Sequence, residues 1–223
     1  TAIKKHITIG KKPKAIIVVH LYGMPAKMKN IIELSKKYEI PIIEDAAESL
    51  GSKIDNILCG CFGDFGILSF NGNKIITTSG GGAIISSDDK AIVKARFLST
   101  QAKENAEHYE HKEIGYNYCL SNVSAAIGIG QLSVLEERIL ARRKNYYFYY
   151  NLLSSIEGIS FLDEPKGYYS NRWLTSIVID KSKFKNIDSR KFRLTLEREN
   201  IESRPLWKPM HLQPIFKDCS YFG

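Results

Sequence analysis

Apolar residues recur along the chain in two patterns, one typical of buried strands and one of amphipathic helices. Residues 15–21 form a continuous run rich in Ile and Val, which predicts a buried strand of a parallel sheet. Residues 28–38 carry apolar side chains near helical spacing, and residues 40–46 form a second apolar run with a proline near its start, where a strand tolerates one. This strand–helix–strand order predicts a βαβ crossover and a parallel sheet.

The middle of the chain predicts two further strands and one long helix. The strands are expected at residues 67–70 and 82–86, with a triple glycine just before the second, so that a hairpin pairing is open. Apolar side chains three or four residues apart predict a helix from residue 123 to about residue 150, capped by Ser121 or Asn122. A helix of this length can bridge two domains.

The pattern changes after Gly158 to short apolar runs separated by turn residues. Strands are expected at residues 160–162 and 173–179, and a helix at about residues 188–200. We therefore predict an α/β chain with two partial domains. Residues 1–139 would form a large domain with a mostly parallel sheet and helices, and residues 140–223 a small α+β domain.

Composition and charge exclude some classes of protein. The chain has 223 residues with 32 Lys and Arg against 24 Asp and Glu, and the net charge of +8 leaves a nucleic-acid-binding module open as an alternative. The basic residues are spread from Lys4 to Lys217 without a block of five like charges, which favours an ordinary solvated surface or anionic small ligands. We expect no nucleic-acid partner. No apolar run of about 20 residues is present, so membrane insertion is not expected either.

The cysteines and the N-terminus give two further expectations. Cys59 and Cys61 are too close together for the usual zinc-binding pair, which favours reduced thiols, no metal site and a cytoplasmic location. The first residues lack the apolar region of a signal peptide and an initiator Met. The chain therefore reads as a piece of a longer protein.

Candidate chemistry lies at two predicted strand ends. Asp45 follows the apolar run of residues 40–43, and Lys74 lies on a turn after the strand at residues 67–70. A lysine amine can form a Schiff base with the aldehyde of pyridoxal phosphate, and a carboxylate can keep the pyridine nitrogen of that cofactor protonated. Each residue alone also has an ordinary interpretation, as an exposed turn lysine or as a helix-capping aspartate.

Several stretches in order along the chain resemble the DegT/StrS family of pyridoxal-phosphate-dependent sugar-nucleotide aminotransferases. They are VHLYG (19–23), IEDAAESLGS (43–52), FGDFGILSFNGNKIITTSGGG (62–82), HYEH (108–111), IGYNY (114–118), SNRWL (170–174) and ESRPLWKPMH (202–211). The similarity is greatest to the bacillosamine-type enzymes, which aminate UDP-4-keto-6-deoxy-N-acetylhexosamines. The resemblance implies part of a fold-type I transferase, shortened at both ends relative to the family.

The resemblance also implies roles for individual residues. Lys74 would form the Schiff base with pyridoxal 5'-phosphate, Asp45 would pair with its ring nitrogen, and Ser69 would bind its phosphate. Glu48 would contact the phenolic oxygen or flank the ring, with a solvated glutamate of a first helical turn as the alternative. Asn117 would reach the cofactor phosphate of a neighbouring subunit, which implies a homodimer with shared active sites. Cys119 stands where the family pattern has Arg, so a positive charge is missing there.

The implied reaction moves an amino group from an amino acid, glutamate, to C4 of a nucleotide-linked 4-keto-6-deoxy sugar, with UDP as the expected nucleotide. Such a reaction would serve the synthesis of surface glycan or glycoprotein sugars. Candidates for sugar or diphosphate contacts, each with a structural role as the alternative, are His108, His111, Arg172, Trp173, Arg204 and His211. A further alternative is an inactive fragment of such an enzyme that binds no cofactor.

Overall fold

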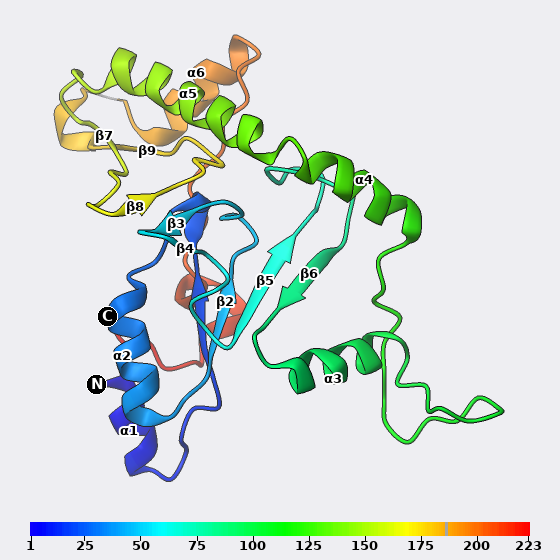
Figure 1. Ribbon diagram of the computed structural model, residues 1–223. Helices are drawn as coiled ribbons and strands as arrows, with labels where there is room; N and C mark the ends of the chain where they lie inside the picture. Colours follow the sequence, from blue (N-terminus) through cyan, green and yellow to red (C-terminus); the bar gives the residue numbers. More distant parts are fainter. Residues whose placement is uncertain (186) are drawn as a thin grey trace. The chain divides into compact units, whose positions relative to one another are not determined.

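A four-stranded sheet with the strand order β1-β2-β5-β6 organises the part of the chain that carries the predicted site (Figure 1). The computed structural model describes residues 1–185 and 187–223. β1 (Ile16–Val19), β2 (Ile42–Asp45) and β5 (Phe65–Ser69) are parallel, and β6 (Gly82–Ile85) pairs antiparallel with β5. The predicted mostly parallel sheet is confirmed, and the pairing of β5 with β6 settles the open hairpin.

Contacts within the chain divide it into two compact units. The sheet unit comprises Lys14–Tyr146 and Glu164–Leu174, and the second unit comprises Thr1–Pro13, Tyr147–Asp163 and Thr175–Gly223. The segment Glu164–Leu174 thus belongs with residues far earlier in the sequence. The predicted domain boundary between residues 139 and 140 stays a prediction. The boundaries of these two units fall at other residues.

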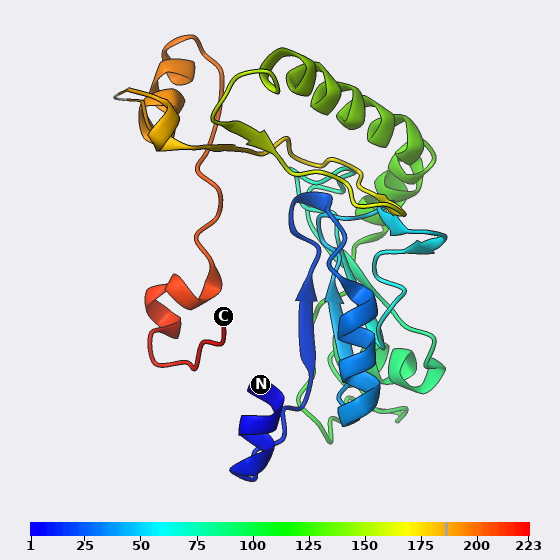
Figure 2. The same cartoon turned by 90° about the vertical axis from the view of Figure 1, so that its left-hand side faces the viewer.

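Helix α2 (Met28–Tyr38) has the bounds that the sequence predicts and lies against the sheet (Figure 2). Its Met28 packs with Val18 and Ile42 in a buried cluster. Because successive side chains of a strand alternate between faces, Ile17 and Val19 turn to the opposite face, where they are 70% and 47% exposed. The prediction of a fully buried first strand is therefore wrong, since β1 is buried on one face only.

The residues that directly follow Lys74 form part of a second core. Ile75 and Ile76 follow that lysine directly and are buried together with Ile139. A small three-stranded sheet with the order β4-β3-β8 ties the Glu164–Leu174 segment to this region; its strands are β3 (Lys53–Ile54), β4 (Ile57–Leu58) and β8 (Tyr168–Tyr169). The lysine turn is therefore anchored by apolar residues on one side and by a returning segment on the other.

The predicted long helix is wrong, because the structure has two helices, α4 (Asn122–Leu132) and α5 (Leu135–Leu153). Between them the Ser133 hydroxyl donates to the carbonyl of Gly130 at 2.8 Å, and the N–H of Val134 donates instead to Gln131. The side chain thus takes the acceptor that Val134 would use in a continuous helix. Ser121 is the N-cap of α4, since its Oγ accepts from the N–H of Ser124.

Helix α3 (Asp89–Ser99) is not among the predicted elements, although Asp88 caps it by accepting from the N–H groups of Lys90 and Ala91. A capping aspartate before apolar residues is the signal that could have found this helix. None of the helices in the described part of the chain has the length and apolar character needed to cross a membrane.

The second unit contains helices and a two-stranded sheet. β7 (Ile159–Phe161) pairs antiparallel with β9 (Ile177–Ile179), so the strand predicted at residues 173–179 is shorter than expected. Besides the end of α5, its helices are α1 (Ala2–Thr8) and α6 (Ser189–Arg198), and Asp188 caps α6. The short 3-10 helices η2, η3 and η4 are Lys181–Lys183, Met210–Leu212 and Pro214–Phe216.

Candidate active site

Two predicted site residues end neighbouring strands at the same edge of the sheet. Asp45 is the last residue of β2 and Ser69 the last residue of β5, and the two strands run parallel with Asp45 opposite Ile67. In open α/β sheets, ligands bind at the carboxyl ends of the strands. Asp45 and Ser69 therefore lie where a ligand of this fold is expected.

The turn after β5 brings Lys74 into the sheet unit. The N–H of Lys74 donates to the carbonyl of Asn71 at 3.1 Å, and Phe70 exchanges main-chain hydrogen bonds with the Thr78–Gly81 stretch. Gly81 has a φ of +89°, and a Cβ there would lie 2.4 Å from the side chain of Leu120. Any residue with a Cβ would be strained at this φ and would clash with Leu120, so the position favours glycine.

The amine of Lys74 is enclosed. Its side chain is only 12% exposed, with Nζ 3.7 Å from Oε1 of Glu48 and 4.5 Å from the centroid of the Trp173 ring. The alternative of an exposed turn lysine is therefore wrong. An amine held between a carboxylate and an indole face has its direction fixed before any ligand is present.

Glu48 is buried beside Lys74 and is not a solvated residue of a helix. It also accepts a hydrogen bond of 2.6 Å from the N–H of Tyr22, a residue of the 3-10 helix η1 (Leu21–Gly23) with a φ of +55°. Burial raises the pKa of Glu48 above its usual range and outweighs the opposing effects of the Tyr22 N–H and of Lys74. The alternative interpretation of Glu48 is therefore wrong.

Asp45 does not cap a helix, because a turn follows β2. Its Oδ1 accepts from the N–H of Ala47 at 3.1 Å, and its negative charge contributes to the raised pKa of Glu48. The two carboxylates thus lie close enough to interact. Glu44, the residue before Asp45, is fully buried.

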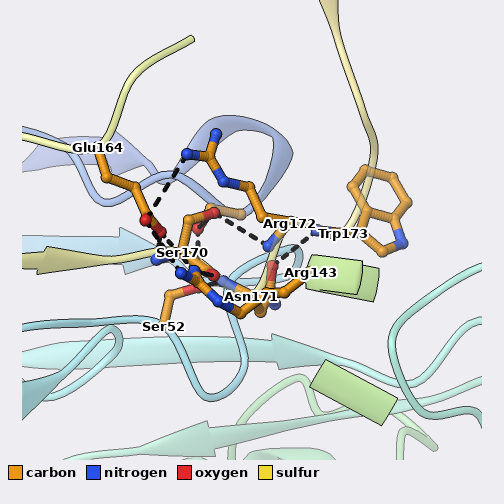
Figure 3. A network of polar contacts seen from close by, with 8 residues as sticks. Ser52, Arg143, Glu164, Ser170, Asn171, Arg172 and Trp173 are labelled. Atoms are coloured by element: carbon orange, nitrogen blue, oxygen red, sulfur yellow. Dashed lines mark hydrogen bonds and ion pairs between the residues drawn. The ribbon is translucent and has the colours of Figure 1, made fainter. Parts of the chain in front are cut away.

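Trp173 of the SNRWL stretch lies over Lys74. The stretch is held by a network of polar and charged groups (Figure 3). Arg143 donates to both carboxylate oxygens of Glu164, at 2.5 and 3.1 Å, and to the carbonyl of Ser170 at 2.5 Å. The N–H of Ser170 donates to Glu164 at 2.6 Å. Burial acts to raise the pKa of Glu164, but the bonds from Arg143 and Ser170 outweigh it and hold the pKa below its usual range.

Arg172 belongs to the same network. Its guanidinium lies 3.7 Å from Glu164 and stacks 3.7 Å from the ring centroid of Tyr146, and the residue is 6% exposed. These contacts describe the structural alternative that the sequence left open for Arg172. Its part in substrate binding stays a prediction.

The other predicted residues are exposed or lie in the second unit. Asn117 forms an isolated bridge with Thr100, Nδ1 of His111 lies 2.9 Å from the carbonyl oxygen of Gln101, and His108 is exposed. In the second unit, Arg204 forms an ion pair with Glu202, and His211 stacks on Tyr221. The roles of Asn117, His108, His111, Arg204 and His211 stay predictions.

Sequence reasoning missed two residues of the site. Tyr22 supplies an N–H to Glu48, and Asn171 bonds to the backbone of Glu48. Both belong to stretches that resemble the family, VHLYG and SNRWL, so the stretches are the signal that could have found them. Trp173, a candidate for sugar or diphosphate contacts with a structural role as the alternative, has its ring over Lys74, and its part in substrate binding stays a prediction.

The side chains at this edge of the sheet fit pyridoxal phosphate by their chemistry. An enclosed amine can bind an aldehyde covalently, a carboxylate can pair with a protonated ring nitrogen, and a hydroxyl can donate to a phosphate. Lys74, Asp45 and Ser69 are the residues that offer these groups. In the described part of the chain, no group of three or more His, Cys, Asp or Glu side chains could hold a metal ion.

Comparisons with known proteins agree with this chemistry. The model of the DegT/DnrJ/EryC1/StrS aminotransferase family matches residues 1–222. The chain is 51% identical over 214 residues to EpsN of Bacillus subtilis, which is named as a pyridoxal phosphate-dependent aminotransferase, with 96% of this chain and 54% of EpsN covered. It is 34% identical over 209 residues to the GDP-perosamine synthase of Vibrio cholerae, covering 94% of this chain and 56% of that enzyme.

A solved structure has the same fold. The crystal structure of a DegT DnrJ EryC1 StrS aminotransferase from Brucella abortus superposes with a TM-score of 0.85 at 31% identity, covering 97% of this chain and 56% of that one. The chain thus spans about half the length of the relatives it matches.

Proposed function

Because the chain belongs to the DegT/DnrJ/EryC1/StrS aminotransferase family, we propose that the protein transfers an amino group from glutamate to C4 of a nucleotide-linked 4-keto-6-deoxy sugar. The observation that carries the proposal is the enclosed Lys74 amine, 3.7 Å from Glu48, in a turn directly after the strand that Ser69 ends. UDP is the nucleotide that the sequence resemblance favours, whereas one relative is named for a GDP-linked product.

The proposed residues would hold the cofactor through different groups. Pyridoxal phosphate, when bound, supplies an electron sink for the amino-group transfer. Lys74 would bind it covalently, Asp45 would hold its ring nitrogen protonated, and Ser69 would donate to its phosphate. Asn117 would reach the phosphate of a second copy, so that two subunits complete each site.

Lys74 also has a second part in the proposal. Nζ of Lys74 would be the group that moves a proton at the reacting carbon of the substrate. Glu48 lies 3.7 Å from this nitrogen and is itself fixed by the N–H of Tyr22. The carboxylate would therefore orient the amine for that step.

The test is an assay of the full-length protein with pyridoxal phosphate, glutamate and a 4-keto-6-deoxy sugar linked to either UDP or GDP. We expect 2-oxoglutarate to form with the UDP sugar, and Lys74→Ala to abolish it while the exposed control Lys29→Ala does not. Turnover with the GDP sugar alone would overturn the choice of nucleotide. A protein that binds no cofactor would favour the alternative of an inactive fold. The expected homodimer and cytoplasmic location stay predictions.

A further inference from the structure

We propose that Trp173 and Asn171 are positioning residues for Lys74, acting through a returning segment that closes over the lysine. The inference rests on the proposed role of Lys74 in cofactor binding. Both residues belong to Glu164–Leu174, which is grouped with the sheet unit although the rest of its sequence neighbourhood is not. The segment brings an indole ring to the candidate active site from about 100 residues away.

Trp173 contacts the lysine region at two points. Its indole N–H donates to the carbonyl of Asn73 at 2.7 Å, on the residue directly before Lys74. The face of the same ring lies 4.5 Å from Nζ of Lys74, a distance at which an ammonium group is attracted to an aromatic face. One side chain therefore fixes both the main chain that carries the lysine and the position of its amine.

Asn171 is hydrogen-bonded to both residues that lie against the Lys74 amine, Trp173 and Glu48. Its Oδ1 accepts from the main-chain N–H of Trp173 at 2.9 Å, and its Nδ2 donates to the carbonyls of Glu48 at 2.9 Å and Leu50 at 3.0 Å. Glu48 is the carboxylate on one side of Nζ, and Trp173 is the ring close to it. A single buried amide thus ties the two contacts together.

An asparagine is the residue that this position requires. The side chain is fully buried and uses its amide group both as a donor and as an acceptor, which neither a carboxylate nor an apolar side chain can do. The main-chain N–H of Asn171 donates to the hydroxyl of Ser52 at 2.9 Å. An aspartate in its place would set carboxylate oxygens against the carbonyls of Glu48 and Leu50.

The charged network fixes the base of the segment. Glu164, Arg143 and Ser170 are joined by hydrogen bonds, and the indole of Trp173 points away from this cluster (Figure 3). The segment is thus anchored by ionic bonds at one end and reaches Lys74 with the other. A positioning role follows, because the segment that contacts the lysine is also bonded to this network.

The test measures how fast each lysine of the cofactor-free protein is acetylated by a trace of acetic anhydride, with mass spectrometry of the peptides. We expect Trp173→Leu to raise the rate at Lys74 about fivefold, since the ring no longer covers the amine, with the exposed Lys29 and Lys90 unchanged. Trp173→Phe keeps an aromatic face but loses the bond to Asn73, so its rate at Lys74 should fall between those of wild type and Trp173→Leu. Trp207→Leu, at an exposed tryptophan of the second unit, is the matched control.

Asn171→Asp is a second test variant, which changes the positioning amide and keeps the indole ring of Trp173. We expect it also to raise the rate at Lys74. A folded Trp173→Leu variant with a wild-type rate at Lys74 overturns the proposal, as does an equal increase at all lysines. If Trp173→Leu does not fold, an unchanged Lys74 rate in Asn171→Asp overturns it. Because the labelling needs no cofactor, failure of the proposed function would instead appear as absence of cofactor binding in the wild type.

Discussion

Oε2 of Glu44 lies 2.8 Å from Nε2 of His20, and both side chains are fully buried. Nδ1 of His20 accepts from the N–H of Ala26 at 3.0 Å, so the ring hydrogen must be on Nε2 and the ring is neutral. The carboxylate of Glu44 also accepts from the N–H groups of Gly60, Phe62 and Gly63. One buried charge therefore holds together the loops that follow β1 and precede β5, directly beside Asp45.

Glu44→Gln should destabilise the protein by about 1–3 kcal/mol, since the amide nitrogen cannot accept and leaves buried N–H groups without a partner. Burial acts to raise the pKa of Glu44, but the bonds from His20, Gly63 and Gly60 outweigh it and hold the pKa below its usual range. Urea unfolding at neutral pH measures the change. The control is Glu33→Gln, at an exposed position of α2, and an equal loss in both variants would contradict the account.

Glu164→Gln should lower stability at neutral pH and much less in acid. A carboxyl whose pKa is lowered in the folded state contributes stability that is present above its ordinary pKa of about 4.3 and is lost as the pH falls through the folded value. The pKa of Glu164 is lowered in this way by Arg143 and Ser170. Melting temperatures of wild type and variant should converge from pH 7 toward pH 3. A gap that stays constant, or one equal to that of the exposed Glu107→Gln, would show that the ion pair does not contribute.

Local patterns predict the elements whose sequence signal is local. The spacing of Met28, Ile31 and Ile32 predicts α2 with both of its bounds, because one apolar face of that helix packs on the sheet. The break after α4 could not be predicted in the same way. At the break the Ser133 hydroxyl donates to the carbonyl of Gly130, and nothing in the apolar pattern distinguishes that serine from one that faces solvent.

The site depends on contacts that no local pattern contains. Lys74 and Asp45 can be proposed from strand ends and motifs, but the enclosure of the amine requires Trp173, which lies about 100 residues further along. The burial of Glu48 depends likewise on Tyr22 and Asn171, whose bonds to it span 26 and 123 residues. Stretches that resemble a family indicate that these segments matter, and only the fold shows what they touch.

Asp45→Asn should leave cofactor binding partly intact and slow proton abstraction roughly 100-fold, the size of effect typical for the loss of one preorganised electrostatic partner. A neutral amide no longer stabilises the positive charge on the ring nitrogen. The measurement is the single-turnover rate of the full-length protein carrying the aminated cofactor, with a bound keto-sugar. Asp89→Asn, in the first turn of α3, is the control. A rate within a few-fold of wild type would show that Asp45 does not pair with the ring.

Covalent attachment of the cofactor to Lys74 is the central claim, and one measurement tests it most directly. The full-length protein is incubated with pyridoxal phosphate, the bond between lysine and cofactor is reduced with borohydride, and the digested peptides are read by mass spectrometry. The enclosed amine beside Glu48 and Trp173 predicts a stoichiometric adduct on the peptide that contains Lys74, and its loss in Lys74→Ala. An adduct spread over exposed lysines, or one that persists in Lys74→Ala, would contradict the account.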